Sequence, residues 1–428
     1  MRVLLEKIVG GGQALGTLED GRRAFVWGGL PGETVDIRIT KKKSKYVEGV
    51  VEEIITPNPN RIEPKDLDSF LSTSPWQIMP FQDEQAQKSA LIREAFELHH
   101  VTLPETPKVY TDDVQYGYRN KVEFSWYSDT DAISGVDTLD IAFFRRGSKG
   151  KIVVNSSSLA RPEINTLAQA IRDLLRTKPV TARNLKTLLV RSDQQGNCVW
   201  QLYLKDKIDN LISSHEASQL PAQGGEVIFS NPKSPASVIT ERLAEFGDIA
   251  LTDTILGTPF RYATESFFQI NIPVYEQALR DMAQFTANNT AKVLDLYSGV
   301  GTIGLTIGGD DVTLVEINEH AVREMRQNIA GLHKNATAIL APSEQALDYI
   351  TSDKIIIVDP PRAGLHQAVI DRLLEQTPPR IIYLSCNPVT QARDVSLLQE
   401  KYQITHIQGY NFFPRTPHIE NLIVLDKV

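Results

Sequence analysis

The sequence predicts an α/β protein in three parts: a small β-barrel, a mixed α+β centre and a C-terminal doubly wound sheet. The chain has 428 residues, which is enough for several domains, because one domain typically takes about 100–200 residues. β-rich runs separated by glycine turns fill residues 1–56. Short apolar runs alternate with helix-length stretches in the last third of the chain, which is typical of a parallel sheet covered on both faces.

The composition is that of a globular protein, with 41% hydrophobic and 23% charged residues. The sequence contains no long uncharged apolar run, so we expect a cytoplasmic protein with no membrane partner. Its two cysteines are too few for a disulfide framework or a thiolate-only metal site. The net charge of −8 argues against a nucleic-acid partner, because phosphate binding normally requires basic surface.

Residues 1–56 predict four or five short strands in a closed or nearly closed barrel. Glycine turns separate the apolar runs Val3–Val9, Ala24–Val26, Thr34–Ile39 and Tyr46–Ile55. Four lysines crowd one turn: Lys41, Lys42, Lys43 and Lys45. They form either a solvated edge that prevents strand pairing or a phosphate-binding patch. This segment holds 9 Lys+Arg against 8 Asp+Glu, so a local patch, and not the net charge, bears on phosphate binding.

Residues 57–250 predict a mixed α+β domain. A proline-rich linker, 56–64, is followed by a helix over Gln82–Leu98. Further helices are expected over Glu163–Arg176 and Ala236–Phe246. Strands are expected in GYRNKVEFSWY, DIAFFRRG and NCVWQLYL. Cys198 lies in the last of these strands and is expected to be a small core residue.

Residues 251–428 predict the parallel sheet. Its apolar runs are KVLDLYSGVGTIGL, VTLVEIN, ATAILAP, KIIIVDPPRAGL, RIIYLSCNP, ITHIQGY and ENLIVLDKV. Helices are expected between them, for example over His320–Gly331 and His366–Gln376. In such sheets, ligands bind beyond the carboxyl ends of the strands, so the polar residues that follow each run are the candidate site.

The first run ends in a glycine-rich turn, Gly299–Gly304, with the spacing of a dinucleotide-binding loop. Asp295 precedes the turn, where it would oppose a pyrophosphate but suits the cationic end of S-adenosylmethionine. Glu316 ends the second strand about 20 residues later, where an acid binds ribose hydroxyls. S-adenosylmethionine is therefore the favoured ligand, and NAD is the alternative.

Three further candidate residues lie at the ends of later strands. Asp359 is held at the rim by two prolines, unless the segment is a plain Asp-Pro turn. Cys386 precedes an expected helix N-terminus, where a thiol can have a lowered pKa and act as a nucleophile; the alternative is that it only packs in the core. Glu420 precedes the last strand and is a candidate base, with His418 as the alternative.

A thiol, a carboxylate base and a methyl donor together suggest methylation of a pyrimidine at carbon-5. Carbon-5 is a poor nucleophile until a thiolate adds at carbon-6. A base must then remove the carbon-5 proton so that the thiol can leave.

At these residues the sequence resembles the RNA 5-methyluridine methyltransferase family over essentially the whole chain. The N-terminal segment is similar to a TRAM domain, and GYRNKVEF (117–124) resembles the central-domain motif. The catalytic-domain motifs match in order: SFFQIN (266–271), DLYSGVGTIGL, VDPPRAGL, SCNP and the HIEN stretch that ends at Asn421.

The resemblance implies an OB-like TRAM barrel (1–56), a central α+β domain (57–250) and a Rossmann-like class I methyltransferase domain (251–428). It implies a monomeric enzyme that methylates carbon-5 of a specific uridine in tRNA or rRNA. Cys386 would be the nucleophile and Glu420 the base. The implied S-adenosylmethionine contacts are Gln269, Tyr297, Gly299, Gly301, Thr302, Glu316 and Asp359. The implied RNA contacts are Phe268, which would stack near a flipped uracil, with Lys41, Lys42, Lys43 and Arg119.

The sequence departs from many members of this family at one place. They carry an iron–sulfur cluster on four cysteines, at positions that fall near Asp66, Ser72, Pro75 and Ser157 here. None of these is cysteine, so neither a cluster nor another metal is expected. Two alternative functions are methylation of another RNA base, such as cytosine at carbon-5, and RNA binding or folding with methyl transfer secondary. Glu420 and SFFQIN favour uridine.

Overall fold

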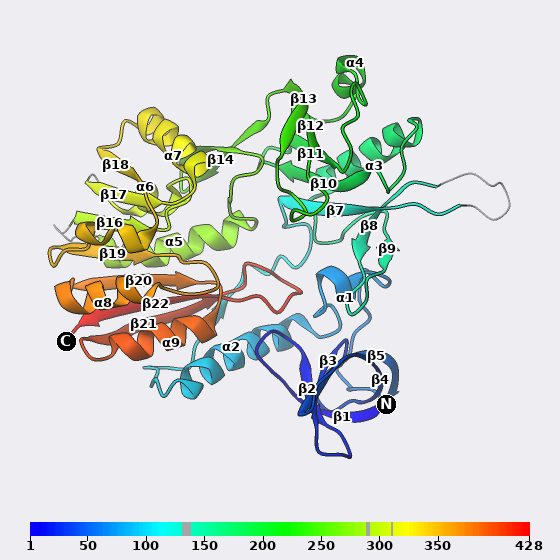
Figure 1. The fold of residues 1–428 in the computed structure, drawn as a ribbon. Helices are drawn as coiled ribbons and strands as arrows, with labels where there is room; N and C mark the ends of the chain where they lie inside the picture. The colour runs from blue at the N-terminus through cyan, green and yellow to red at the C-terminus, as the bar shows by residue number, and fades with distance from the viewer. Residues whose placement is uncertain (131–137, 288–291, 310) are drawn as a thin grey trace. The chain divides into compact units, whose positions relative to one another are not determined.

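The computed structural model describes residues 1–130, 138–287, 292–309 and 311–428. They form two compact units, drawn as ribbons in Figure 1. The first unit comprises Met1–Pro80 and Val114–Leu251, and the second comprises Phe81–Asp113 and Thr252–Val428. Within the described ranges, no helix is both long enough and apolar enough to span a lipid bilayer.

The first unit begins with the expected barrel, which is closed in the order β1-β2-β3-β5-β4. Its strands are β1 (Arg2–Ile8), β2 (Ala14–Thr17), β3 (Arg23–Trp27), β4 (Thr34–Lys42) and β5 (Tyr46–Thr56). Alternate side chains point inward because successive residues of a strand face opposite sides. The barrel core contains Val3, Leu5, Ala24, Val26 and Val35, among others.

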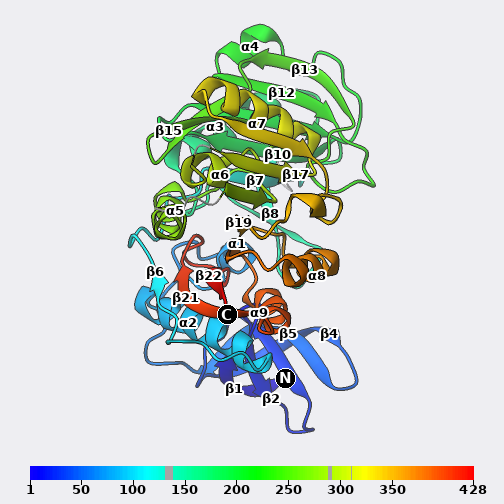
Figure 2. The same ribbon diagram turned by 90° about the vertical axis from the view of Figure 1, so that its left-hand side faces the viewer.

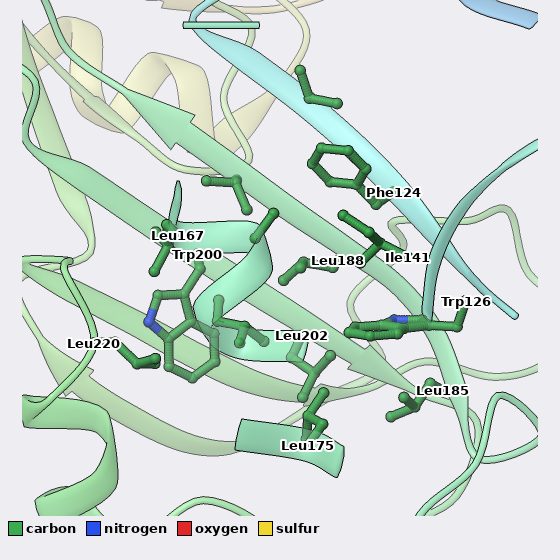
Figure 3. Packing of buried hydrophobic residues seen from close by; sticks show 14 of the residues in the cluster. Phe124, Trp126, Ile141, Leu167, Leu175, Leu185, Leu188, Trp200, Leu202 and Leu220 are labelled. Carbon is green, nitrogen blue, oxygen red and sulfur yellow. The ribbon is translucent and has the colours of Figure 1, made fainter. Parts of the chain in front are cut away.

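A seven-stranded sheet completes the first unit, in the order β13-β12-β11-β10-β7-β8-β9. The strands are β7 (Lys121–Tyr127), β8 (Asp140–Phe144), β9 (Lys151–Val153), β10 (Leu185–Ser192), β11 (Cys198–Leu204), β12 (Gly224–Phe229) and β13 (Glu241–Gly247). The helices are α1 (Phe70–Thr73), α3 (Pro162–Arg176) and α4 (Ser214–Ser218). The apolar stripe of α3 packs on one sheet face, where Phe124, Trp126 and Trp200 fill the core (Figure 3). Cys198 is buried in this core, as expected.

The expected helix over Ala236–Phe246 is wrong, because the structure has the strand β13 there. Its alanine, glutamate and leucine residues favour a helix in isolation. In the folded chain, the segment instead pairs antiparallel with β12 along the edge of the sheet. The ring of Phe246 stacks on that of Trp200, with centroids 5.9 Å apart. Strand pairing and this contact override the local preference.

The second unit is built on an eight-stranded sheet in the order β18-β17-β16-β19-β20-β22-β21-β6. The strands are β6 (Val109–Tyr110), β16 (Lys292–Leu296), β17 (Val312–Glu316), β18 (Ala336–Leu340), β19 (Lys354–Val358), β20 (Arg380–Ser385), β21 (Tyr402–Tyr410) and β22 (Glu420–Lys427). A separate hairpin pairs β14 (Ala250–Ile255) with β15 (Thr258–Ala263).

Helices cover both faces of this sheet, and Figure 2 shows α5 and α8 on opposite sides of the strands. The long helix α2 packs against α9. The helices are α2 (Phe81–Leu98), α5 (Ile272–Thr286), α6 (Thr302–Ile307), α7 (Glu319–Leu332), α8 (Gln367–Gln376) and α9 (Pro388–Leu398), with two 3-10 turns, η1 (Ser343–Gln345) and η2 (Leu347–Tyr349).

The expectation of a parallel sheet is wrong only for the last run of the sequence, β22; the preceding run, β21, points in the same direction as β20 because both are antiparallel to β22. Strands β18, β17, β16, β19 and β20 are parallel, whereas β22 runs antiparallel to both β20 and β21. The reason lies in the connection between β21 and β22. Only residues 411–419 separate these strands, with no crossover helix, and a short loop of this kind joins antiparallel neighbours.

Candidate active site

The site lies in the second unit, at the edge where the carboxyl ends of the parallel strands meet. Strand β16 pairs with β17 and β19, and β19 pairs with β20, so these four strands end side by side. Strand β22 is antiparallel to β20, and Asn421 pairs with Ser385. The first residue of β22, Glu420, therefore lies at the same edge as Cys386, the first residue after β20.

The glycine loop after β16 is formed by conformations that other residues rarely adopt. Gly299 has φ +56° and Gly301 has φ +91°, both in the left-handed region. The peptide N–H of Gly299 donates to Glu316 Oε2 at 3.0 Å, which holds the loop against the end of β17. Gly304 packs directly on β16, because a Cβ there would lie 2.8 Å from Asp295 Oδ2.

Acidic groups dominate this edge. Asp295 is fully buried; its Oδ2 accepts from the N–H of Gly304 at 2.9 Å, whereas Oδ1 has no hydrogen-bond partner among the described residues. Burial raises the pKa of Asp295 to about 8, and neighbouring Asp359 and Glu316 add to the shift. Burial also raises the pKa of Asp359 to about 7. A nearby positive charge lowers such raised pKa values and stabilises the ionised cluster, so the site suits a cationic ligand.

Two tyrosines border the acidic cluster. Tyr297, which precedes the glycine loop, has φ +64°, a conformation that is rare outside glycine and often marks functional sites. Tyr275 of α5 was not expected from the sequence. Its hydroxyl lies 2.8 Å from Oγ1 of Thr302, and the ring packs edge-on against Phe412. Only its place one turn into the helix that follows SFFQIN could have pointed to it.

The thiol and the candidate base lie in a negative environment. Glu420 is 4% exposed, and burial, with the neighbouring charge of Asp359, raises its pKa well above the usual value. Burial, followed by the charges of Glu420 and Asp359, raises the pKa of Cys386 to about 11. The expected lowering of the thiol pKa is therefore wrong. The nearby helix N-terminus does not offset desolvation and two acidic neighbours.

Arg362 is the cation that opposes these shifts. Its charge lowers the pKa values of both Cys386 and Glu420. Its backbone oxygen accepts from Asn387 Nδ2 at 2.9 Å and from Thr390 Oγ1 at 3.1 Å, which joins the turn after β19 to the start of α9. The guanidinium lies 3.3 Å from Nδ1 of His418. The sequence motif DPPR contained this residue, but its role became visible only from the neighbouring strands.

The two phenylalanines of SFFQIN differ in exposure. The ring of Phe268 is stacked on Tyr262, with centroids 3.9 Å apart, and the residue is only 3% exposed. Phe267 is 71% exposed. Gln269 is buried in the same segment, and the side chain of Asn271 donates to the backbone oxygen of Phe412 at 3.2 Å.

The remaining expected RNA contacts belong to the first unit. Lys41 pairs with Glu48 across the β4–β5 hairpin, with Nζ 2.6 Å from Oε1, so its charge is partly neutralised. Lys42 and Lys43 are exposed at the end of the same hairpin. Arg119 is half-buried before β7, where its backbone N–H donates to the oxygen of Leu159.

Two of the positions where relatives were expected to hold an iron–sulfur cluster, Asp66 and Ser157, are hydrogen-bonded polar residues. Asp66 Oδ2 accepts from Ser158 Oγ at 2.6 Å and from Gln77 Nε2 at 3.0 Å. The N–H of Ser157 donates to Asn165 Oδ1 at 2.9 Å. Across the described ranges, no group of three or more His, Cys, Asp or Glu side chains is arranged to hold a metal ion.

Comparison with known proteins matches most of the chain, residues 1–51 and 81–428, to family models. Residues 81–347 and 344–428 match the family model described as tRNA (Uracil-5-)-methyltransferase. Residues 1–51 match the TRAM domain. The chain is 30% identical to an uncharacterized RNA methyltransferase of Enterococcus faecalis, over 94% of this chain and 92% of that protein. It is 26% identical to another from Thermosynechococcus vestitus, over 97% of this chain and 95% of that protein.

A solved structure has the same fold. It is the Pyrococcus abyssi tRNA (uracil-54, C5)-methyltransferase in complex with S-adenosyl-L-homocysteine, with a TM-score of 0.80 and 21% sequence identity. The match covers 99% of this chain and 100% of that chain.

Proposed function

Because the chain belongs to the tRNA (uracil-5-)-methyltransferase family of S-adenosylmethionine-dependent RNA methyltransferases, we propose that it methylates carbon-5 of a specific uridine in tRNA or rRNA. The observation that carries this proposal is the pairing of β20 with antiparallel β22. It brings the thiol of Cys386 and the carboxyl group of Glu420 to the edge that also bears the acidic cluster.

The residues at this edge fit S-adenosylmethionine. The buried Asp295, with an oxygen that lacks a hydrogen-bond partner among the described residues, and the raised pKa of Asp359 both favour a cationic group nearby. Glu316 presents a carboxylate for the ribose hydroxyls of this cofactor. Ile317 beside it has an exposed apolar side chain, which suits contact with the adenine ring. We assign Gln269, Tyr297, Gly299, Gly301 and Thr302 to the same pocket. When bound, S-adenosylmethionine supplies an electrophilic methyl group.

The proposed reaction begins at Cys386. Its thiolate adds to carbon-6 of the uracil, and the electron pair of the C5=C6 bond shifts to carbon-5 and the carbon-4 oxygen. The activated carbon-5 then takes the methyl group; the bond between that methyl group and the sulfonium breaks, and S-adenosylhomocysteine is the leaving group. Because the thiol pKa is raised, the thiolate form requires positive charge beside it. Arg362 supplies such a charge from the turn after β19.

Glu420 completes the reaction as the base. Its carboxylate removes the carbon-5 proton, the C5=C6 double bond re-forms, and the S–C6 bond breaks to release the thiolate. Burial raises the pKa of Glu420, which strengthens it as a base. The same shift means that it must lose its proton before it can act.

RNA contacts are proposed from both units. The exposed lysines of the β4–β5 hairpin, Lys42 and Lys43, would contact phosphates, with a smaller share for the paired Lys41. Arg119 is a further candidate contact. A flipped uracil requires an aromatic surface to stack on, and the exposure of the rings favours Phe267 over the buried Phe268.

The function is tested by incubating the purified chain with S-adenosylmethionine and unmodified tRNA or rRNA, followed by nucleoside mass spectrometry. Wild-type protein should form 5-methyluridine, and Cys386→Ala should form none while still binding RNA. Glu420→Gln should accumulate a protein–RNA adduct that survives denaturation, because the methylated adduct cannot eliminate. If 5-methylcytidine forms instead, the target base is cytosine and not uracil. Methylation by Cys386→Ala would refute the thiol mechanism.

A further inference from the structure

A buried pair of charges lies on α2, remote in sequence from the residues of the proposed reaction. Glu84 and Lys88 are one helical turn apart, both are fully buried, and Lys88 Nζ lies 3.0 Å from Glu84 Oε1. Burial lowers the pKa of Lys88. Desolvation of two buried charges can outweigh their attraction, so such a pair is weak evidence for a stabilising role. Its other contacts indicate what it does.

Both side chains hold the loop between β21 and β22, residues 411–419. Asn411 Nδ2 donates to Glu84 Oε1 at 2.9 Å. Lys88 Nζ donates to Asn411 Oδ1 at 2.5 Å and to the backbone oxygen of Phe413 at 3.2 Å. The start of the loop is therefore fixed to α2 by charge-assisted hydrogen bonds, which are stronger than those between neutral groups.

The middle of the loop is fixed to the same carboxylate. Arg415 has φ +66°, a left-handed conformation that is unusual for a long side chain. Its backbone N–H donates to both oxygens of Glu84, each at 3.0 Å. Its guanidinium lies 5.3 Å from the ring centroid of Phe81, also on α2. Glu84 thus accepts hydrogen bonds from Arg415, whose left-handed backbone conformation is needed for the loop to turn.

The anchored part of the loop leads directly to the proposed base. Thr416 Oγ1 donates to the backbone oxygen of Phe413 at 2.8 Å and accepts from the N–H of His418 at 3.3 Å. Two residues later, β22 begins at Glu420. We propose that Glu84 and Lys88 are positioning residues that fix the 411–419 loop and so direct the carboxylate of Glu420 at carbon-5 of the uracil. This inference rests on the proposed uracil-C5 methylation.

Such a role affects one step more than the others. Glu420 acts after the thiolate has added and the methyl group has transferred. A loop displaced by about 1 Å should slow proton removal by about 10²-fold, whereas formation of the covalent adduct and binding of S-adenosylhomocysteine should change little. A purely stabilising role would instead lower the melting temperature and slow all steps together.

The test uses the double variant Glu84→Gln/Lys88→Met in the full chain. It removes Glu84 and Lys88 together, since removing one alone leaves the other buried and unpaired; the buried guanidinium of Arg415, 3.8 Å from Glu84 Oε2, also loses this partner. The matched control is Glu97→Gln, which removes a charge from the exposed pair Arg93–Glu97 on the same helix at the same i,i+4 spacing. Single-turnover reactions are followed for 5-methyluridine and for the RNA adduct on denaturing gels, beside S-adenosylhomocysteine affinity and melting temperature.

We expect the double variant to accumulate adduct and to form 5-methyluridine about 10²-fold more slowly, with S-adenosylhomocysteine affinity within about twofold of wild type. The control should match wild type. If adduct and product fall together, or neither changes, the positioning role is wrong.

A second variant, Thr416→Val, keeps the buried charges and removes the hydroxyl that links the anchored loop to His418. It should also accumulate adduct, and an unchanged single-turnover profile would contradict the proposal even if the double variant fails to fold. If wild-type protein forms neither adduct nor 5-methyluridine, the proposed function fails, and the positioning role fails with it.

Discussion

The buried carboxyl group of Asp295 should make the stability of the second unit depend on pH. Its pKa is raised from 3.8 to about 8 by burial, so the folded chain retains a proton that the unfolded chain releases above about pH 4. Stability from this group is therefore complete below pH 4 and is lost as the pH rises toward 8. One pKa unit corresponds to about 1.4 kcal/mol, and the group is half ionised at pH 8, so its contribution falls by about 2 kcal/mol between pH 6 and pH 8.

The perturbation is Asp295→Asn, which keeps an oxygen to accept the N–H of Gly304 but does not titrate. In wild-type protein, Asp295 should contribute a loss of about 2 kcal/mol of unfolding free energy between pH 6 and pH 8. The variant should lose about 2 kcal/mol less than wild type over this range, and the part of the slope that comes from Asp359, whose pKa is also raised, should remain.

All four tryptophans, Trp27, Trp76, Trp126 and Trp200, belong to the first unit, so their fluorescence does not report on β16. The protein is therefore equilibrated in urea at each pH and then labelled with a brief hydrogen-exchange pulse at one fixed pH. Mass spectrometry of peptides from β16 and β19 then gives the fraction of protein in which the second unit is unfolded. A variant with the same pH slope as wild type would refute the assignment of this titration to Asp295.

Three further predictions concern other parts of the chain. Gly304→Ala should destabilise the second unit by about 1–3 kcal/mol in urea unfolding, because the added Cβ would clash with the side chains of Leu314 and Asp295. An unchanged unfolding midpoint would show that α6 can shift to accommodate the methyl group. Alkylation of Cys386 by iodoacetamide should quicken about tenfold per pH unit between pH 7 and 9, since its pKa is about 11, and peptide mass spectrometry showing a plateau near pH 7 would contradict the raised pKa. Lys42→Gln/Lys43→Gln should reduce the slope of log affinity for RNA against log salt by about 1–2, measured by filter binding, and an unaltered slope would exclude these lysines as phosphate contacts.

Much of the fold could be predicted because its elements have strong local patterns. Helix α3 carries an apolar stripe at helical spacing, and the strands β16, β17, β19 and β20 are continuous apolar runs that end in polar residues. The candidate residues at those ends could be named because parallel strands share one carboxyl edge. Strand β13 was predicted as a helix because its strand state depends on β12, its partner in the sheet.

The electrostatics of the site could not be predicted, since they depend on residues that only the fold brings together. The raised pKa of Cys386 comes from burial and from Glu420 and Asp359, which lie on other strands. The contact between Lys88 and Asn411 joins residues 323 positions apart. Neither the pKa shift nor this contact can be read from a local stretch of sequence, whereas the SCNP motif around Cys386 can.

The direction of β22 explains why this site needs an anchored loop. If β22 ran parallel to β20, its first residue would lie at the opposite edge of the sheet, about 25 Å away for a strand of eight residues. Reversal brings Glu420 to the rim but replaces a crossover helix with the loop 411–419. A loop lacks the regular hydrogen bonds of a helix, so its conformation must be fixed by other groups. The buried carboxylate of Glu84 accepts from Arg415 and Asn411 at the points where that loop turns. The cost of burying this charge is therefore a direct consequence of delivering the proposed base from an antiparallel strand.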